Sequence, residues 1–140
     1  MMKRPRVASC LLVLVLQAGA VMATPTVPPG PPDYADPEQL LALVAGATVP
    51  YLLVDVRTPA EYNAGHIPTA LNVPVTEIAQ HPPTDDKDAL IIVYCGSGVR
   101  SARAAAALEG IGYTRVVDFG PVSRWTGSLD SAGPGKEPVP

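Results

Sequence analysis

The sequence predicts an α/β fold in which helices cover both faces of a mostly parallel β-sheet, giving three layers. Short apolar segments typical of strands alternate along the chain with segments that carry helix-start signals. The clearest strand, residues 89–94, is uncharged and rich in β-branched residues, as strands covered on both faces are. Functional sites in such sheets lie at the carboxyl ends of the strands.

Residues 1–23 have the organisation of a secretory signal peptide and are set aside from the fold. Basic residues open the segment, an apolar run over residues 7–16 follows, and small residues come after it. The run is shorter than the roughly 20 residues of a membrane-spanning helix, so we prefer a cleaved leader to an uncleaved anchor. We expect cleavage after Ala20 or, preferably, Ala23, and a periplasmic or secreted protein that has no membrane attachment once the leader is removed.

The chain that remains after cleavage is acidic and holds one cysteine. The leader contains three of the ten basic residues and none of the 13 acidic ones, so the formal net charge from residue 24 onward is −6. This charge disfavours nucleic acid as a partner. Cys95 has no partner for an internal disulfide, and we expect no metal site.

The rest of the chain divides into three parts. Residues 24–33 are rich in proline and predict a linker, residues 34–129 contain the folded domain, and residues 130–140 predict a flexible tail. No internal repeat is visible, which excludes solenoids and propellers.

The folded domain is expected to begin with a helix. Asp36 is a capping residue, and Pro37 is suited to the first turn, where its missing N–H is not needed. Gly46 ends this helix, and the apolar run at residues 51–55 predicts a buried strand.

A second helix should follow the first strand. Thr58 and Glu61 have the spacing of a capping box, and Gly65 ends the helix. Residues 70–73 then predict a second strand, and residues 76–80 predict a single helical turn.

The last elements follow the strand at residues 89–94. Residues 101–108 are rich in alanine and predict a helix that can lie close to the sheet. Residues 113–117 predict a final strand, and Gly120 and Pro121 after it lead into a predicted turn toward Trp125.

The segment from Cys95 to Arg100 joins the strongest strand to a helix predicted to begin at Ser101. Such a turn points successive N–H groups inward, and the helix start adds partial positive charge. Gly96 and Gly98 permit tight curvature and positive φ. Because a cysteine at the start of this nest ionises readily, we predict that Cys95 is a nucleophilic thiolate; the alternative is a buried structural cysteine.

Other catalytic arrangements are disfavoured. The sequence has no Gly-x-Ser-x-Gly elbow for a Ser-His-Asp hydrolase, and it lacks the Cys-x-x-Cys pair of a redox thiol protein. Neither His66 nor His81 has a spacing that suggests a base or a metal ligand, and we interpret His66 as a core or turn residue that makes hydrogen bonds.

Four segments, in order, resemble the rhodanese, or sulfurtransferase, domain family. They are residues 54–57; Glu61-Tyr62 with residues 65–68, Ala70 and residues 72–74; residues 94–101; and a closing stretch with Ala104, Leu108, residues 112–113, Val116, Gly120 and Trp125. The pattern is most similar to small, single-domain, exported rhodaneses of the phage-shock type. The resemblance implies a rhodanese-like three-layer α/β/α fold with a mostly parallel, five-stranded sheet.

The resemblance also implies a thiosulfate sulfurtransferase that uses no cofactor. Cys95 would take a sulfane sulfur from thiosulfate or a similar small anion, become a persulfide, and pass the sulfur to cyanide or a thiol. Arg100 would bind the sulfonate part of the donor, while Asp55 and Arg57 would brace the loop as an ion pair. The implied substrate-binding residues are Gly96, Ser97, Gly98, Val99 and Arg100, and the implied supporting residues are Asp55, Arg57 and Ser101.

Loop length separates this prediction from related enzymes. Cys95 to Arg100 has the form Cys-x4-Arg, whereas phosphatases and arsenate reductases of this fold use a Cys-x5-Arg loop that is wide enough for phosphate. The loop lacks a second cation such as lysine, and residues 121–125 depart from the Gly-rich turn of small rhodaneses. The alternative function is a non-catalytic module that carries sulfur or binds a protein, and we expect a monomer or weak dimer.

Overall fold

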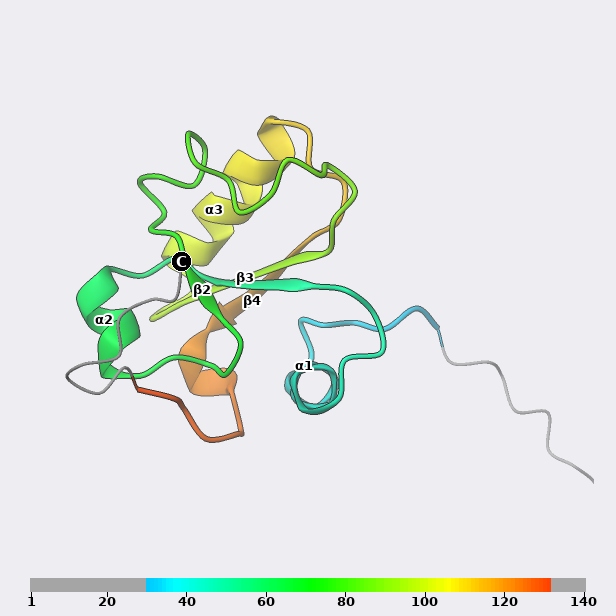
Figure 1. The fold of residues 1–140 in the computed structure, drawn as a ribbon, viewed down its shortest axis with the longest axis vertical. Coiled ribbons are helices and arrows are strands. Elements are labelled where there is room, and N and C mark those ends of the chain that lie inside the picture. The colour runs from blue at the N-terminus through cyan, green and yellow to red at the C-terminus, as the bar shows by residue number, and fades with distance from the viewer. Residues whose placement is uncertain (1–29, 132–140) are drawn as a thin grey trace, which may run out of the picture. The chain divides into compact units, whose positions relative to one another are not determined.

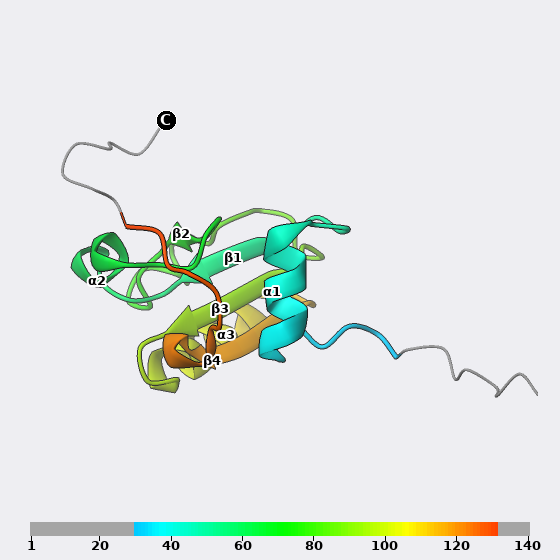
Figure 2. The same cartoon turned by 90° about the horizontal axis from the view of Figure 1, so that it is seen from below.

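The structure, a computed structural model, describes residues 30–131. These residues form a parallel sheet of four strands in the order β2-β1-β3-β4, with α1 on one face and α3 on the other (Figure 1 and Figure 2). The elements are α1 (Pro37–Ala45), β1 (Leu52–Asp55), α2 (Pro59–Ala64), β2 (Leu71–Asn72), β3 (Ile91–Cys95), α3 (Val99–Gly110), β4 (Val116–Pro121) and a 3-10 helix (Val122–Arg124). The predicted α/β/α fold is confirmed, with four strands in the described residues where the resemblance implies five.

Local capping signals begin the first two helices where the sequence predicts them. Asp36 Oδ1 accepts hydrogen bonds from the N–H groups of Glu38 and Gln39, both at 3.0 Å. At α2, the Glu61 N–H donates to Thr58 Oγ1 at 3.3 Å, and the Thr58 N–H donates to Glu61 Oε2 at 3.0 Å. These reciprocal bonds complete the predicted capping box.

The strand β3 divides the core between two faces because its side chains alternate in direction. Ile92 and Tyr94 belong to the cluster under α1, whereas Ile91, Val93 and Cys95 belong to the cluster under α3. All of them are fully buried, as predicted for a strand covered on both faces. The cysteine therefore ends a rigid, central element of the sheet.

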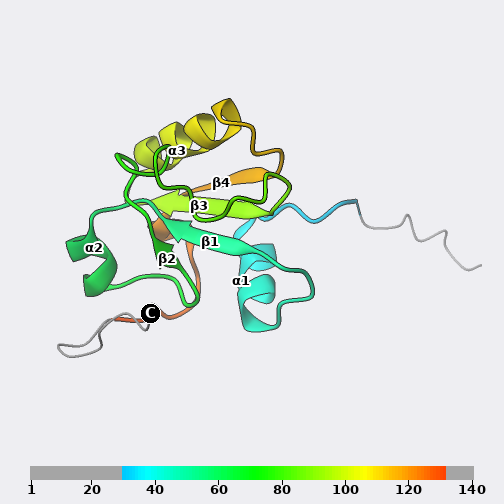
Figure 3. The ribbon, with the colours of Figure 1, turned by 45° about the horizontal axis from the view of Figure 1, so that its top comes forward.

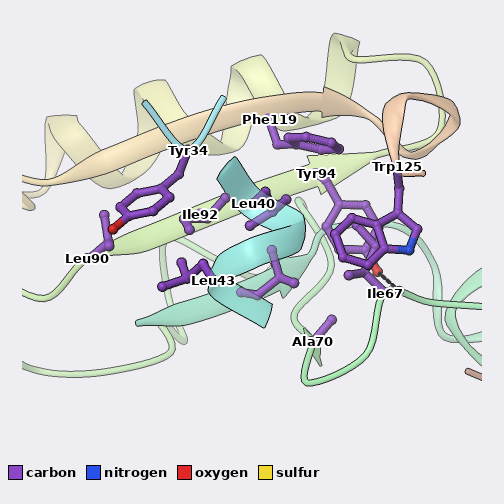
Figure 4. Packing of buried hydrophobic residues seen from close by; sticks show 11 residues of the cluster. Tyr34, Leu40, Leu43, Ile67, Ala70, Leu90, Ile92, Tyr94, Phe119 and Trp125 are labelled. Atoms are coloured by element: carbon purple, nitrogen blue, oxygen red, sulfur yellow. Dashed lines mark hydrogen bonds between the residues drawn. The ribbon is translucent and has the colours of Figure 1, made fainter. Parts of the chain in front are cut away.

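Figure 4 shows the α1 side of the core. Leu40 and Leu43 from α1 pack over Ile92 and Tyr94 of β3. The Ile67 N–H donates to the buried hydroxyl of Tyr94 at 3.0 Å. This bond ties the segment that follows α2 to the central strand, close to the end of the sheet where the cysteine lies.

The helix α3 begins earlier than the sequence predicts. We expected it to start at Ser101, but it starts at Val99 because Gly98 takes a left-handed φ of 92° and serves as the N-cap without any side-chain bond. No side-chain capping signal marks this boundary in the sequence. The helical turn predicted at residues 76–80 is present as hydrogen-bonded turns over residues 75–80, in which the N–H of Ile78 donates to the Pro74 carbonyl oxygen and that of His81 to the Glu77 carbonyl oxygen.

The strand β4 is shifted relative to the prediction, and covers Val116–Pro121 rather than residues 113–117. Its position is set by pairing with β3, including a register irregularity next to Tyr94. Gly120 pairs with Tyr94, so Gly120 and Pro121 belong to the strand, and the predicted turn toward Trp125 follows them as the 3-10 helix Val122–Arg124. The strand and turn preferences of single residues could not predict this pairing.

The predicted signal peptide, most of the linker and most of the tail lie outside the described residues. Within residues 30–131, no helix is long and apolar enough to cross a membrane. At the C-terminal end of this range, Asp130 and His66 exchange two backbone hydrogen bonds of 2.8 Å. This bridge ties the end of the described chain to the segment after α2.

Thr69 has a φ of 72°, a conformation that strains a β-branched residue. We expect Thr69→Gly to raise the free energy of unfolding by about 1 kcal/mol, because relief of strain should outweigh the exposed hydrogen bond between Thr69 Oγ1 and Tyr51 Oη. Urea denaturation measures the difference. Tyr51→Phe removes only the hydrogen bond and serves as the control. A less stable Thr69→Gly variant would show that the hydrogen bond outweighs the strain.

Candidate active site

The candidate site lies at the carboxyl end of the sheet, where β3 turns into α3. Figure 3 shows β1 and β3 ending at this edge of the sheet, with α2 beside it. Cys95 is the last residue of β3, and it pairs with Pro121 at the end of β4. The loop between Cys95 and α3 is therefore held between a neighbouring strand and a helix start.

Glycine is favoured at one position of this loop by its backbone conformation, and a Cβ there would be tight against Pro121. Gly98 has a φ of 92°, and a Cβ built on it would lie 3.3 Å from Pro121 Cδ and 3.8 Å from Gly120 Cα. Gly96, for which we also predicted freedom for positive φ, does not use it. A Cβ on Gly96 would instead lie 3.1 Å from Arg100 Nη2. Gly96 therefore leaves room for the guanidinium.

The loop directs hydrogen-bond donors at the sulfur. The Gly98 N–H donates to Cys95 Sγ at 3.0 Å, and Cys95 is fully buried. Burial raises the pKa of the Cys95 thiol, but hydrogen bonds from Ser101, Gly98 and Ser97 outweigh burial and lower the pKa below its ordinary value. The sulfur is thus enclosed by polar groups at the loop rather than by hydrocarbon alone.

The hydroxyl of Ser101 has two acceptors within reach. It donates to the Gly98 carbonyl oxygen at 3.1 Å, and the same hydroxyl contributes to the lowered pKa of Cys95. A hydroxyl has a single proton to donate, and an ionised sulfur is a stronger acceptor than a neutral carbonyl. We expect this proton to turn toward the sulfur when Cys95 ionises.

Alkylation of Cys95 by iodoacetamide should titrate with an apparent pKa below the ~8.5 of a free thiol. With the pKa lowered in the folded state, the folded protein binds fewer protons than the unfolded chain. The resulting stabilisation is complete above the unfolded pKa and is lost as the pH falls through the folded pKa. Ser101→Ala should raise the apparent pKa. An apparent pKa at or above that of a free thiol would contradict this assignment.

Arg100 lies in the first turn of α3 and is bound to a carboxylate that the sequence did not single out as a site residue. Its Nη1 donates to Glu61 Oε2 at 2.8 Å, and its Nη2 donates to Glu61 Oε1 at 2.9 Å. Arg100 and, next, the N–H of Thr58 lower the pKa of Glu61 to about 2. The two residues are far apart in the sequence, and only the placement of α2 beside the loop brings them together.

Asp55 and Arg57 form the predicted ion pair, but the pair is bound to the end of α2 rather than to the loop after Cys95. Arg57 Nη2 lies 2.6 Å from Asp55 Oδ2 and also donates to the Gly65 carbonyl oxygen at 2.6 Å. Within residues 30–131, no hydrogen bond joins either side chain to residues 96–101. The pair holds the end of α2, the helix that carries Glu61, so any support for the loop is indirect.

The remaining candidate residues have simpler surroundings. The side chains of Ser97 and Val99 are exposed, so these residues face the loop's interior only through their backbone. His66 stacks on Tyr62 with ring centroids 3.8 Å apart, and its Nδ1 lies 2.9 Å from the Tyr62 carbonyl oxygen, in keeping with a turn role. In the described part of the chain, no cluster of His, Cys, Asp and Glu could hold a metal ion.

The fold and the site together define a class of protein: an α/β domain with a buried cysteine in an amide-lined loop between a parallel strand and a helix. The chain belongs to the rhodanese family, because the family model described as Rhodanese-like domain matches residues 36–125. This match confirms the family that the sequence motifs resemble.

Relatives of this chain include small sulfurtransferases. A protein named Sulfurtransferase from Allochromatium vinosum is 44% identical over 75 residues, which cover 53% of this chain and 70% of that protein. Thiosulfate sulfurtransferase PspE from Escherichia coli is 34% identical over 87 residues, which cover 58% of this chain and 84% of that protein. The predicted similarity to single-domain rhodaneses of this type is supported.

Among solved structures, a rhodanese with anions from E. coli is similar to this chain. It has 30% sequence identity and a TM-score of 0.51, and the match covers 58% of this chain and 98% of that chain. Nearly all of that small protein therefore corresponds to the folded part of this chain.

Proposed function

We propose that this protein is a sulfurtransferase that moves a sulfane sulfur from thiosulfate or a similar donor to cyanide or a thiol through a persulfide on Cys95. The observation that carries the proposal is the contact of the Gly98 N–H with Cys95 Sγ at 3.0 Å, within a loop that lowers the pKa of the thiol. The membership of the rhodanese family and the sulfurtransferase relatives support the reaction class.

In the first step, the Cys95 thiolate attacks the sulfane sulfur of thiosulfate. A new sulfur–sulfur bond forms, the bond between the two sulfurs of thiosulfate breaks, and sulfite leaves with the electron pair. In the second step, the acceptor attacks the outer sulfur of the persulfide. With cyanide, thiocyanate leaves and the Cys95 thiolate is regenerated, so the cycle needs neither an external oxidant nor a reductant.

The loop serves both steps by stabilising negative charge near the sulfur. The Gly98 N–H donates to Cys95 Sγ, hydrogen bonding from Ser101 and Ser97 also lowers the pKa of the thiol, and the start of α3 adds partial positive charge. The buried position of Cys95 keeps water from the persulfide between the two steps.

The test is the intact mass of the purified protein before and after incubation with thiosulfate. We expect a gain equal to the mass of one sulfur atom, and loss of that gain with release of thiocyanate when cyanide is added. If no sulfur is gained from thiosulfate or any related donor, the proposed function is wrong.

The complete burial of Cys95 favours one second candidate, a non-catalytic module that carries sulfur to a bound protein. Such a module loads one sulfur but turns over negligibly with small acceptors, and loses its protein partner when the loop is altered. Steady-state thiocyanate production separates the two, since sustained turnover is expected only of an enzyme.

We further propose that the protein acts in the periplasm or outside the cell, as a monomer or weak dimer, after cleavage near Ala23. The support is the order of charged, apolar and small residues in the first 23 positions. The intact mass of protein recovered from the periplasm or medium identifies the residue at which cleavage occurs. Recovery of the full-length chain from membranes would contradict the proposal.

A further inference from the structure

The guanidinium of Arg100 already has an anion bound to it. Each of its two terminal nitrogens donates to a different oxygen of Glu61, at 2.8 and 2.9 Å. This is the two-point geometry with which arginine binds planar or tetrahedral oxyanions. An anionic donor that uses the same nitrogens must therefore displace the Glu61 carboxylate.

Glu61 is held in this position by bonds other than the one to Arg100. Its Oε2 also accepts from the N–H and the hydroxyl of Thr58, both at 3.0 Å. The end of the same helix is fixed by the bond from Arg57 to the Gly65 carbonyl oxygen. Moving the carboxylate away from Arg100 would therefore also disrupt the cap of α2.

The ion pair lies over the loop that holds the sulfur. A Cβ built on Gly96 would lie 3.1 Å from Arg100 Nη2 and 3.9 Å from Glu61 Oε1. Both side chains remain partly exposed, at 31% and 39%, so a small molecule that approaches the loop meets them. The positive charge of Arg100 beside the loop is therefore balanced by the carboxylate of Glu61.

A second guanidinium near the end of β4 does not replace Arg100. Arg124 donates to the carbonyl oxygen of Phe119 at 2.7 Å and to that of Ala35 at 2.9 Å. Protonation does not release Arg100 either, because the pKa of Glu61 is lowered to about 2 and the carboxylate stays charged at neutral pH. Only a competing anion can take the place of Glu61.

We propose that Glu61 is a specificity-determining residue that disfavours doubly charged sulfur donors by occupying Arg100. This inference rests on the proposed sulfurtransferase function and concerns the choice of donor. A donor with two negative charges, such as thiosulfate, is repelled by the Cys95 thiolate and by the Glu61 carboxylate. Arg100 offers it little attraction, because Glu61 already neutralises the guanidinium. A donor with a single charge, such as an alkane thiosulfonate, is repelled less.

The test compares Glu61→Gln with the wild-type protein in steady-state assays with thiosulfate and with methanethiosulfonate. In both reactions the Cys95 thiolate takes the sulfane sulfur, and sulfite or methanesulfinate leaves. Glutamine keeps the capping box of α2 but removes the charge. We expect kcat/KM for thiosulfate to rise roughly three- to ten-fold and kcat/KM for methanethiosulfonate to rise less.

Glu109→Gln is the matched control, because Glu109 is an exposed carboxylate at the far end of α3. It should leave both kcat/KM values unchanged, and its Tm should match that of Glu61→Gln to within a few degrees. If kcat/KM for thiosulfate is unchanged or lower in Glu61→Gln, the proposal is overturned, since Glu61 would then be neutral or would help Arg100 to bind the donor.

A second measurement does not depend on sulfur transfer. Iodoacetate is negatively charged and iodoacetamide is neutral. The ratio of their rates of Cys95 alkylation therefore depends on the electrostatic potential near the sulfur. This ratio should rise several-fold in Glu61→Gln and stay constant in Glu109→Gln. Absence of sulfur loading in the wild type would refute the proposed function, whereas an unchanged alkylation ratio would refute the role of Glu61.

Discussion

Cys95→Ser is expected to abolish both sulfur loading from thiosulfate and release of thiocyanate, with a loss of at least ~10³-fold in rate. A serine hydroxyl does not ionise in the working pH range, so the loop amides have no thiolate to stabilise. The fold should survive, because the Gly98 N–H that donates to the sulfur at 3.0 Å can donate to the serine oxygen. Intact mass and a thiocyanate assay measure the loss, and Tm measures the fold.

The control for this variant is a protein in which Cys95 is the single thiol. Cys10 lies within the predicted leader, so a protein that begins at residue 24 has no thiol other than Cys95. Sulfur loading of Cys95→Ser in that protein would mean that the sulfur is not carried by a cysteine. Loss of sulfur loading together with a large decrease in Tm would mean that Cys95 is needed for folding. The variant would then not test catalysis.

Asp55→Ala should lower the free energy of unfolding by about 3–5 kcal/mol, a large part of the about 5–15 kcal/mol that a domain has. Asp55 is fully buried, and its carboxylate takes two bonds from Arg57 Nε, at 2.9 and 3.0 Å, and one from Nη2 at 2.6 Å. Removing the carboxylate leaves a nearly buried guanidinium without its counter-ion. Urea denaturation measures the change.

Glu61→Gln is the comparison for this prediction, because it removes a carboxylate from a partly exposed pair that is also held by two guanidinium nitrogens. Its cost should stay below about 1 kcal/mol. Replacing both Asp55 and Arg57 with apolar residues of similar size should restore part of the stability lost in Asp55→Ala. A cost for Asp55→Ala as small as that of Glu61→Gln would show that burial does not decide the strength of the pair.

Local signals in the sequence were enough to predict how the first two helices begin. Asp36 and the Thr58–Glu61 capping box act on N–H groups a few residues away, so their effect can be read from spacing alone. The apolar composition of β3 likewise predicted its complete burial. The loop that follows β3 was located in the same way, from its glycines and the helix after it.

The errors and omissions concern features that no local side-chain signal in the sequence marks. The register of β4 depends on its pairing with β3, and the start of α3 depends on a backbone angle at Gly98. The bond between Arg100 and Glu61 joins α3 to α2 across the carboxyl end of the sheet. The capping box explains why Glu61 is present, so nothing in the sequence indicated its second role.

The close fit of Gly98 against the end of β4 limits how this loop could change during evolution. A Cβ on Gly98 would lie 3.3 Å from Pro121 Cδ, which is a tight contact with a strand that pairs with β3. The φ of 92° at Gly98 also disfavours any residue that carries a Cβ. Replacement of Gly98 during evolution would therefore need an accompanying change at the end of β4.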